Sequence, residues 1–180
     1  MFIGTGIRLD IGFNAAEVKL ADLARGGLLG RASGGAYDEW QAGLARVGSQ
    51  RIMLGMSRLA RVRVGDMVTH GESATWAIRW EVADHRGTLV PALDAHITLT
   101  AAGEDATMLT VSGTCQPPLT RQAAGLDPAV VHQVAQATIY AFTNHIATDI
   151  ADPVAAPDAG HDKVLPAPPA SPVSRYAVPG

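Results

Sequence analysis

The segment from Asp127 to Ile150 reads DPAVVHQVAQATIYAFTNHIATDI and carries the longest helical pattern in the chain. Asp127 suits the N-cap of a helix, and Pro128 suits the first helical position, where a missing N–H costs nothing. Apolar and small residues then recur at three- and four-residue steps, the period of one helical face. That face comprises Val131, Val134, Ala135, Thr138, Ala141, Phe142 and His145. The opposite face comprises His132, Gln133, Gln136, Tyr140, Thr143 and Asn144. A helix of this length spans roughly 35 Å, enough to cross a small sheet.

Upstream, apolar and polar residues alternate, which is the period of a strand with one buried face. The pattern occurs at Ile3–Phe13 and again in several stretches between residues 51 and 116. Its clearest instance is the series Ala74, Trp76, Ile78, Trp80 and Val82. Two further series are Leu89, Leu93, Ala95, Ile97, Leu99 and Leu109, Val111, Gly113, Cys115. Turn signals at 84–87 and 102–105 join consecutive strands, so we expect an antiparallel meander that ends at Pro117-Pro118.

Two short helices are expected between the first strand and the meander. Asn14 suits an N-cap with Glu17 three residues later, and the helix that follows should end at Gly26-Gly27. The second helix is marked by Tyr37, Trp40, Leu44 and Val47. This helix is expected to be short, and Gly34, Gly35 and Gly43 in the same stretch argue against it, since each glycine in a helix interior costs about 1 kcal/mol relative to alanine.

Composition excludes several classes of protein. Of 180 residues, 47% are hydrophobic and 17% charged, which is typical of a globular chain. The net charge of −3 gives no electrostatic basis for binding nucleic acid. The first residues lack a signal-peptide pattern, and no apolar run is long enough for integral membrane association. A single cysteine, Cys115, precludes an internal disulfide and fits the cytoplasm, which is the expected compartment.

The composition changes abruptly near residue 151. Seven of the 11 prolines lie between Pro153 and Pro179, together with many alanines. Such a segment buries too little apolar surface to offset the loss of chain entropy. We therefore expect one folded domain at residues 1–151 and a disordered Pro/Ala-rich tail at residues 152–180.

Three motifs connect this element order to a known superfamily. They are Val90-Pro91-Ala92-Leu93-Asp94-Ala95, Ser112-Gly113 followed by Pro117-Pro118-Leu119, and Val134-Ala135-Gln136-Ala137-Thr138. The chain resembles the START-like (SRPBCC) superfamily, which includes Bet v 1 allergens, polyketide cyclases and lipid-transfer domains, and in these motifs its uncharacterised actinobacterial members. The resemblance implies an α+β helix-grip fold, with a curved antiparallel sheet wrapped around a long C-terminal helix and two short helices after the first strand.

The resemblance also implies a cavity between the sheet and the C-terminal helix. We expect it to hold a small hydrophobic molecule of the lipid, polyketide or isoprenoid type. The expected ligand-binding residues are Trp76, Ile78, Trp80, Leu93, Ile97, Val134, Thr138, Ala141, Phe142 and His145. The alternative is that these side chains only fill the core, because burying one large apolar residue stabilises the fold by about 1.5–3 kcal/mol.

No catalytic motif is evident, so the sequence favours binding over catalysis. His145 and Tyr140 are the candidate acid/base residues for an enzyme of the polyketide cyclase or dehydratase type. Asp94 and His96 point the same way on one strand, yet no third metal ligand is placed by the sequence, so neither a metal nor a cofactor is predicted. A third hypothesis is a non-catalytic interaction module with a filled core. A homodimer is left open.

Overall fold

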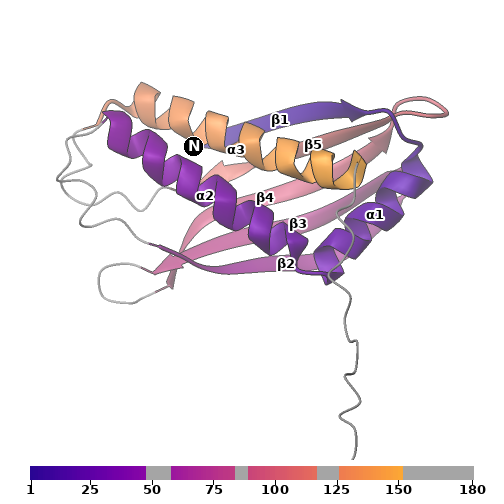
Figure 1. Ribbon diagram of the computed structural model, residues 1–180, viewed down its shortest axis with the longest axis horizontal. Coiled ribbons are helices and arrows are strands. Elements are labelled where there is room, and N and C mark those ends of the chain that lie inside the picture. The colour runs from indigo at the N-terminus through magenta and orange to yellow at the C-terminus, as the bar shows by residue number, and fades with distance from the viewer. Residues whose placement is uncertain (48–57, 84–88, 117–125, 152–180) are drawn as a thin grey trace, which may run out of the picture.

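The computed structural model describes residues 1–47, 58–83, 89–116 and 126–151 (Figure 1). In chain order, the elements are β1 (Phe2–Leu9), α1 (Phe13–Arg25), α2 (Leu28–Val47), β2 (Arg58–His70), β3 (Ser73–Ala83), β4 (Leu89–Ala101), β5 (Thr107–Cys115) and α3 (Pro128–Ala151). This is an α+β helix-grip arrangement, so the predicted fold class is confirmed. The predicted turn at 84–87, the stop at Pro117-Pro118 and the tail at 152–180 lie outside the described residues.

The five strands form one sheet in the order β1-β5-β4-β3-β2. Strands β2 to β5 follow one another as a meander, and β1 pairs with β5 at the far edge. Every neighbouring pair is antiparallel. The register places Trp80 opposite Leu93 and Trp76 opposite Ile97. The predicted antiparallel meander is therefore confirmed.

A β-bulge in β4 changes which side chains face the core. Trp80 pairs with Leu93 but Glu81 pairs with Pro91, so Ala92 is an extra residue on β4. Ala92 and Leu93 are both buried as a result. The prediction that Leu89 shares the buried face of Leu93 is wrong, because the bulge turns Leu89 outward to 40% exposure.

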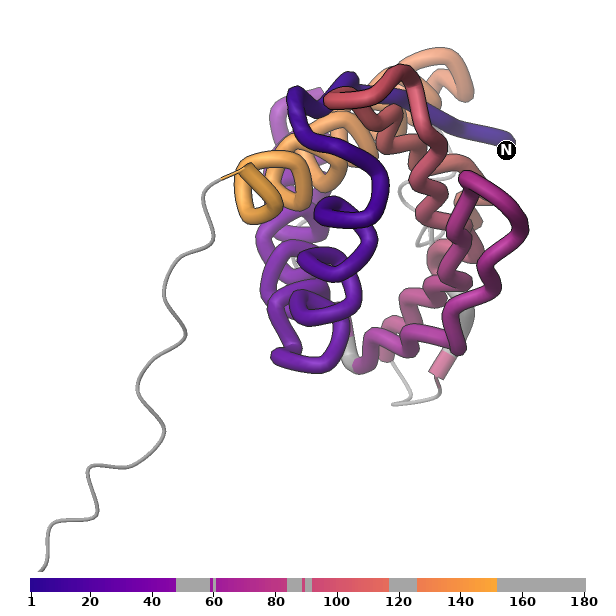
Figure 2. The backbone as a smooth tube through the Cα atoms, turned by 90° about the vertical axis from the view of Figure 1, so that its right-hand side faces the viewer, coloured from indigo at the N-terminus to yellow at the C-terminus, as the bar shows by residue number. Residues whose placement is uncertain are grey.

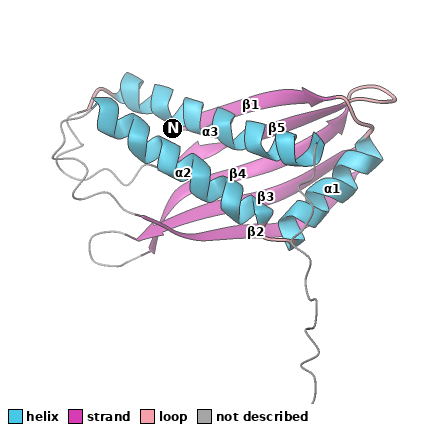
Figure 3. Cartoon of the chain, viewed as in Figure 1, coloured by secondary structure: helices cyan, strands magenta, loops and turns pink. Residues whose placement is uncertain are grey.

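The molecule has two layers, with the three helices on one face of the sheet and nothing described on the other (Figures 2 and 3). Strand β3 shows this directly, because its inward side chains are buried while Ala77 and Arg79 on the outward side are exposed. Its buried side chains are those of the predicted series, Ala74, Trp76, Ile78, Trp80 and Val82. The core therefore lies between the sheet and the helices.

Helix α3 begins as predicted. The Ala129 N–H donates a hydrogen bond to Oδ1 of Asp127 at 2.8 Å, which is the bond of a side-chain N-cap. The helix runs beside the edge strand β1, where Nε2 of Gln136 donates to the Gly4 carbonyl oxygen at 2.6 Å. Gln136 was expected to face solvent. Instead it contacts an edge carbonyl that no strand pairs with.

The buried face of α3 is wider than the predicted stripe and is rotated from it. Its buried residues are Val131, Ala135, Thr138, Ile139, Phe142, Thr143, Ile146 and Ile150. Because α3 contacts α2, β1 and β5, it is buried on more than one side. Thr143 was placed on the polar face by its residue type, yet it is fully buried and donates to the Ile139 carbonyl oxygen at 2.7 Å.

Helices α1 and α2 differ from the predictions at their ends. Strand β1 stops at Leu9, and α1 begins at Phe13 with Gly12 as an N-cap that has no side-chain bond, so the predicted Asn14 cap is wrong. Helix α1 ends at Gly26 as predicted, and Gly27 has the positive φ of 72° that favours glycine. Helix α2 is 20 residues long, not short.

Candidate functional site

The sheet side of the predicted site lies inside the core. Trp76, Ile78, Trp80, Leu93 and Ile97 are all at most 3% exposed and face the helices. Their alternation along β3 and β4 is sufficient to place them there, because the side chains of a strand point to opposite faces in turn. Burial alone does not distinguish a ligand contact from ordinary packing, so their role in binding stays a prediction.

The helix side of the predicted site is only partly correct. Thr138 and Phe142 are buried, whereas Val134 and Ala141 are half-buried. His145 is exposed, so its predicted place on the apolar face of α3 is wrong. The predicted stripe shares Val131, Ala135, Thr138 and Phe142 with the observed one, but it extends to the wrong side of the helix at Val134, Ala141 and His145.

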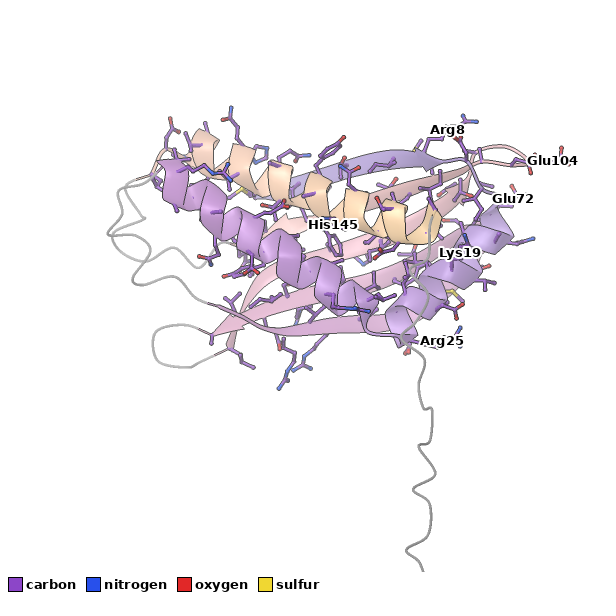
Figure 4. All side chains as sticks on the ribbon, in the orientation of Figure 1. Arg8, Lys19, Arg25, Glu72, Glu104 and His145 are labelled. Atoms are coloured by element: carbon purple, nitrogen blue, oxygen red, sulfur yellow. The ribbon has the colours of Figure 1, made fainter. Side chains whose placement is uncertain are left out.

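His145 lies at the seam between α2 and α3 (Figure 4). A Cβ atom built on Gly35 of α2 would be 3.8 Å from Cε1 of His145, so the imidazole covers this glycine. Tyr140, the second catalytic candidate, is 54% exposed. Neither residue lines the internal cavity described next. The structure therefore does not place either candidate where it would contact a guest between sheet and helix.

Among the described residues, a small apolar cavity lies between the sheet, α2 and α3. Each of β1, α2, β3, β4 and β5 contributes one residue, and α3 contributes three. The lining residues are Ile3, Trp40, Trp80, Leu93, Cys115, Ala135, Thr138 and Ile139. The cavity volume is about 10 Å³, which is the space of one water molecule. Of the predicted site residues, the structure brings Trp80, Leu93 and Thr138 together here.

Four aromatic rings form a chain beside this cavity. Tyr37 contacts Trp40 edge-to-face, with ring centroids 5.3 Å apart, and contacts Trp80 at 6.4 Å. Trp80 in turn contacts Phe142 at 5.4 Å. Edge-to-face pairs of this kind add about 0.5–1.5 kcal/mol beyond their buried area. The ring chain therefore links α2, β3 and α3.

Two members of this site, Tyr37 and Trp40, were not predicted as site residues. In the sequence they served only to mark a helix. The signal that could have identified them is their spacing, because aromatic residues three apart on one amphipathic helix share its buried face. Cys115 was likewise interpreted as a small buried hydrophobe, and its burial agrees with that interpretation.

The titratable groups around the cavity keep their protons at neutral pH. Burial raises the pKa of the Cys115 thiol to about 11. Burial also raises the pKa of Tyr37 to about 12, although a hydrogen bond with Gln41 acts in the opposite direction. Because both groups stay neutral, neither is a base near pH 7. Among the described lining residues there is no histidine and no carboxylate.

Two indole groups at the cavity are unusual in their hydrogen bonding. Nε1 of Trp40 and Nε1 of Trp80 are buried and have no partner among the described residues. The two side chains are only 3% and 1% exposed. A buried donor left without an acceptor costs about 1–3 kcal/mol, because it loses its bond to water and gains none. Two of the residues that line the cavity therefore each carry a buried donor without a partner among the described residues.

The outer face of the sheet carries Asp94 and His96, as their alternation with the buried residues of β4 predicts. Asp94 accepts a hydrogen bond from Nε of Arg79, and this contact raises the pKa of the exposed Arg79 guanidinium. The neighbouring Glu81 accepts a bond from Nε of Arg63 at 3.2 Å. Within the described ranges, no three histidine, cysteine, aspartate or glutamate side chains are close enough to hold a metal ion. The face is a set of exposed ion pairs.

Comparisons with known proteins give structural likenesses only. Neither the protein-family models nor the curated proteins yield a match. Several solved structures are similar, and three of them are described here. A conserved protein from Geobacillus kaustophilus has a TM-score of 0.48 and 15% identity, over 84% of this chain and 95% of that chain. A protein from Thermus thermophilus has a TM-score of 0.37 and 11% identity, over 83% and 97%. An aromatase/cyclase from Streptomyces sp. R1128 has a TM-score of 0.36 and 10% identity, over 83% and 93%.

A separate question is whether a helix could cross a bilayer. Among the helices of the described ranges, none is both long and apolar enough to do so.

Proposed function

We propose that the protein binds a small hydrophobic molecule, of the lipid, polyketide or isoprenoid type, between its sheet and its helices. The observation that supports this is the convergence of β1, β3, β4, β5, α2 and α3 on one apolar cavity. Small-molecule sites are mostly apolar, with a few polar groups that orient the guest. Here aromatic and aliphatic side chains form the walls, and Cys115, Thr138 and the two tryptophans are the lining residues that carry a polar atom.

The cavity lies towards one end of the sheet. It lies where β3 ends, β4 begins and β5 ends, and its helical residues come from the second half of α2 and the first half of α3. The segments that connect these elements, residues 48–57, 84–88 and 117–125, lie outside the described residues. The volume of about 10 Å³ is therefore the space that the described side chains enclose.

A larger guest requires one lining side chain to move, and Trp40 is the best placed to do so. Within the described part of the chain it contacts a single aromatic ring, that of Tyr37, whereas Trp80 contacts both Tyr37 and Phe142. Trp40 is also carried by a helix, not by a strand fixed in the sheet. Withdrawal of its indole would add the volume of that ring system to the cavity.

Binding without turnover is the better supported activity. An acid/base enzyme needs a group that can take or give a proton near neutral pH. Cys115 and Tyr37 hold their protons to about pH 11 and 12, and the exposed His145 and Tyr140 do not line the cavity. The described site thus offers walls and hydrogen-bonding groups for a guest.

Native mass spectrometry followed by organic extraction tests this function. We expect the purified protein to retain an apolar small molecule, or to take up hydrophobic probes with a rise in melting temperature. Ala135→Leu should abolish both effects, because the larger side chain would fill the cavity that Ala135 lines. Ala137→Leu is the matched control, since Ala137 lies on the same helix and is exposed.

The outcomes separate two of the three functional hypotheses. Uptake that is lost in Ala135→Leu and kept in Ala137→Leu supports binding at this cavity. A protein that retains nothing, and whose melting temperature no probe changes, overturns the proposal and supports a filled-core interaction module instead.

A further inference from the structure

Strand β1 is an edge of the sheet, and half of its main-chain groups point away from the sheet (Figure 1). The Cys115 N–H donates to the Met1 carbonyl oxygen at 2.8 Å, and the Met1 amine donates to the Cys115 carbonyl oxygen at 2.9 Å. From this pair the register of β1 with β5 runs residue by residue, and hydrogen-bonded and non-hydrogen-bonded pairs alternate along an antiparallel ladder. Odd-numbered residues of β1 therefore bond to β5, and the outward-pointing residues are Phe2, Gly4, Gly6 and Arg8.

The second half of this outward edge is unpaired. Helix α3 supplies a partner for Gly4, because Nε2 of Gln136 donates to the Gly4 carbonyl oxygen at 2.6 Å. The outward N–H and C=O groups of Gly6 and Arg8 have no hydrogen-bond partner among the described residues, and both residues are exposed. An edge with free donors and acceptors is a template onto which a further strand can add.

A groove lies beside this part of the edge. It has a volume of about 440 Å³ and separates the end of β1 from the last two turns of α3. Its apolar floor consists of Ile7, Ile11 and Ala147, which are partly buried against the core. Asn144 and Thr148 add side chains that can form hydrogen bonds. Free main-chain groups beside an apolar groove are the combination that β-strand addition uses.

The chain itself continues from this groove. Ala151, the last residue of α3, lines the groove, and residues 152–180, which lie outside the described residues, follow it. An added strand must supply main-chain N–H groups, which proline lacks. Only two proline-free runs in this segment are longer than three residues, 158–165 and 173–178.

The second of these runs has the composition of a strand. It reads Val173-Ser174-Arg175-Tyr176-Ala177-Val178. Valine and tyrosine favour strands, whereas aspartate and glycine, which are frequent in the first run, are depleted in them. The composition therefore selects residues 173–178 as the segment that can pair with β1.

Residues 152–172 are long enough to bring this run to the edge. A chain of 21 residues typically has an end-to-end distance on the order of 25 Å. The eight residues of β1 cover about 27 Å, so its whole edge is within reach. A segment tethered in this way is present at an effective concentration on the order of 1 mM.

We infer that residues 173–178 add to β1 as a sixth strand of the sheet. The added strand pairs with the outward groups of Gly6 and Arg8 and covers the apolar floor of the groove at Ile7, Ile11 and Ala147. This inference does not depend on the proposed binding function.

Amide hydrogen exchange in the ¹⁵N-labelled full chain tests the pairing. The Gly6 and Arg8 N–H groups should exchange slowly in the wild-type protein, although they lie on the outward side of β1. Tyr176→Pro removes an N–H from the middle of the proposed strand. It should accelerate both exchange rates by about fivefold or more, which is the net effect of one hydrogen bond. The Thr5 and Ile7 N–H groups, which point to β5, should exchange at the same rate in both proteins.

Ala170→Pro is the matched control, because it adds a proline to the same segment outside the proposed strand. Faster exchange at Gly6 and Arg8 in Tyr176→Pro, with wild-type rates in Ala170→Pro, supports the sixth strand. Equal acceleration in both variants would overturn it, since the effect would then not depend on residues 173–178.

Two further results would overturn the inference and identify another partner for the edge. Fast exchange of Gly6 and Arg8 in the wild-type protein would show that water satisfies their N–H groups. Slow exchange that Tyr176→Pro leaves unchanged, and that is lost on dilution of the protein, would show that the edge pairs with a second copy of the chain.

Discussion

A Cβ atom built on Gly43 of α2 would lie 2.8 Å from Cγ1 of Val134 of α3. Real side chains do not approach so closely, so the missing side chain at Gly43 sets the separation of the two helices at this point. Gly34 of the same helix has no atom within 4 Å of its built Cβ. Gly43 therefore allows α2 and α3 to pack closely, whereas Gly34 of the same helix makes no such contact.

Replacement of these glycines by alanine should have different effects. Gly34→Ala should raise the free energy of unfolding by about 0.5–1 kcal/mol, because alanine is the better helix former and meets nothing. In Gly43→Ala the gain in helix propensity should be cancelled, because overpacking against Val134 typically lowers the free energy of unfolding by about 1–3 kcal/mol. Urea denaturation of both variants measures the difference. Equal stabilisation of the two variants would contradict the role given to Gly43.

In the sheet, Gly113 resembles Gly43 of α2, because a side chain at this position would collide with the neighbouring element. A Cβ atom there would collide with the Asp94 carbonyl oxygen and with the backbone and side chain of Ala95 on β4. A glycine inside a strand often marks such a close backbone approach. Gly113→Ala should therefore lower the free energy of unfolding by several kcal/mol, since the clash is with backbone that can shift only by distorting the β4–β5 ladder.

Gly6→Ala on β1 is the control for this prediction. Its built Cβ is 3.4 Å from Oγ1 of Thr110 and 3.5 Å from Sδ of Met108, which are near-normal contacts. The change should be neutral or stabilise by up to about 1 kcal/mol, as alanine loses less chain entropy than glycine. Thermal denaturation followed by circular dichroism would compare the two. A Gly113→Ala protein as stable as Gly6→Ala would show that β4 and β5 separate easily.

These glycines also show what the sequence could predict. The strands and α3 were predictable because hydrophobic periodicity reports which residues face a core, and the strand period of two is hard to misinterpret. The length of α2 was not, since glycine propensity argues against a helix and the compensating contact, between Gly43 and Val134, joins residues 91 positions apart in the sequence. Long-range contacts of this kind leave no local pattern.

The site was predictable to the same limited extent. Trp80 and Leu93 were placed correctly because each lies on a strand whose alternation fixes its direction. His145 was misplaced because a helix buried on several sides has no single apolar stripe, so a modest rotation of the predicted stripe moves a side chain at its margin from core to solvent. The unpaired indoles of Trp40 and Trp80 follow from three-dimensional surroundings that no spacing encodes.

The stability of the protein should depend on alkaline pH through Cys115 and Tyr37. Burial raises the pKa of Cys115 from 9.0 to about 11 and that of Tyr37 from 10.0 to about 12. Between the unfolded and folded pKa values, the unfolded chain has released protons that the native chain still holds. These two groups should therefore leave the free energy of unfolding unchanged below about pH 9. The free energy of unfolding should then fall as the pH rises from about 9 to about 12.

Cys115→Ala isolates the thiol contribution. Urea titrations at about pH 8 and about pH 10.5, which lie below and inside this pH range, should show a smaller loss of stability in the variant than in the wild-type protein, because one of the two proton-linked groups is gone. The difference between the two proteins removes the effect of other alkaline titrations, which they share. An identical pH dependence in both would mean that the Cys115 thiol titrates alike in the folded and unfolded chains.

The two residues His145 and Phe142 test the corrected face of α3. They lie three positions apart on one helix, yet Phe142 is fully buried against Trp80 and His145 is exposed. His145→Ala should change the free energy of unfolding by less than about 0.5 kcal/mol, whereas Phe142→Ala should lower it by about 3–5 kcal/mol. His145→Ala should also leave probe uptake unchanged. Lost uptake in a stable His145→Ala protein would move the site to the seam between α2 and α3, where His145 lies.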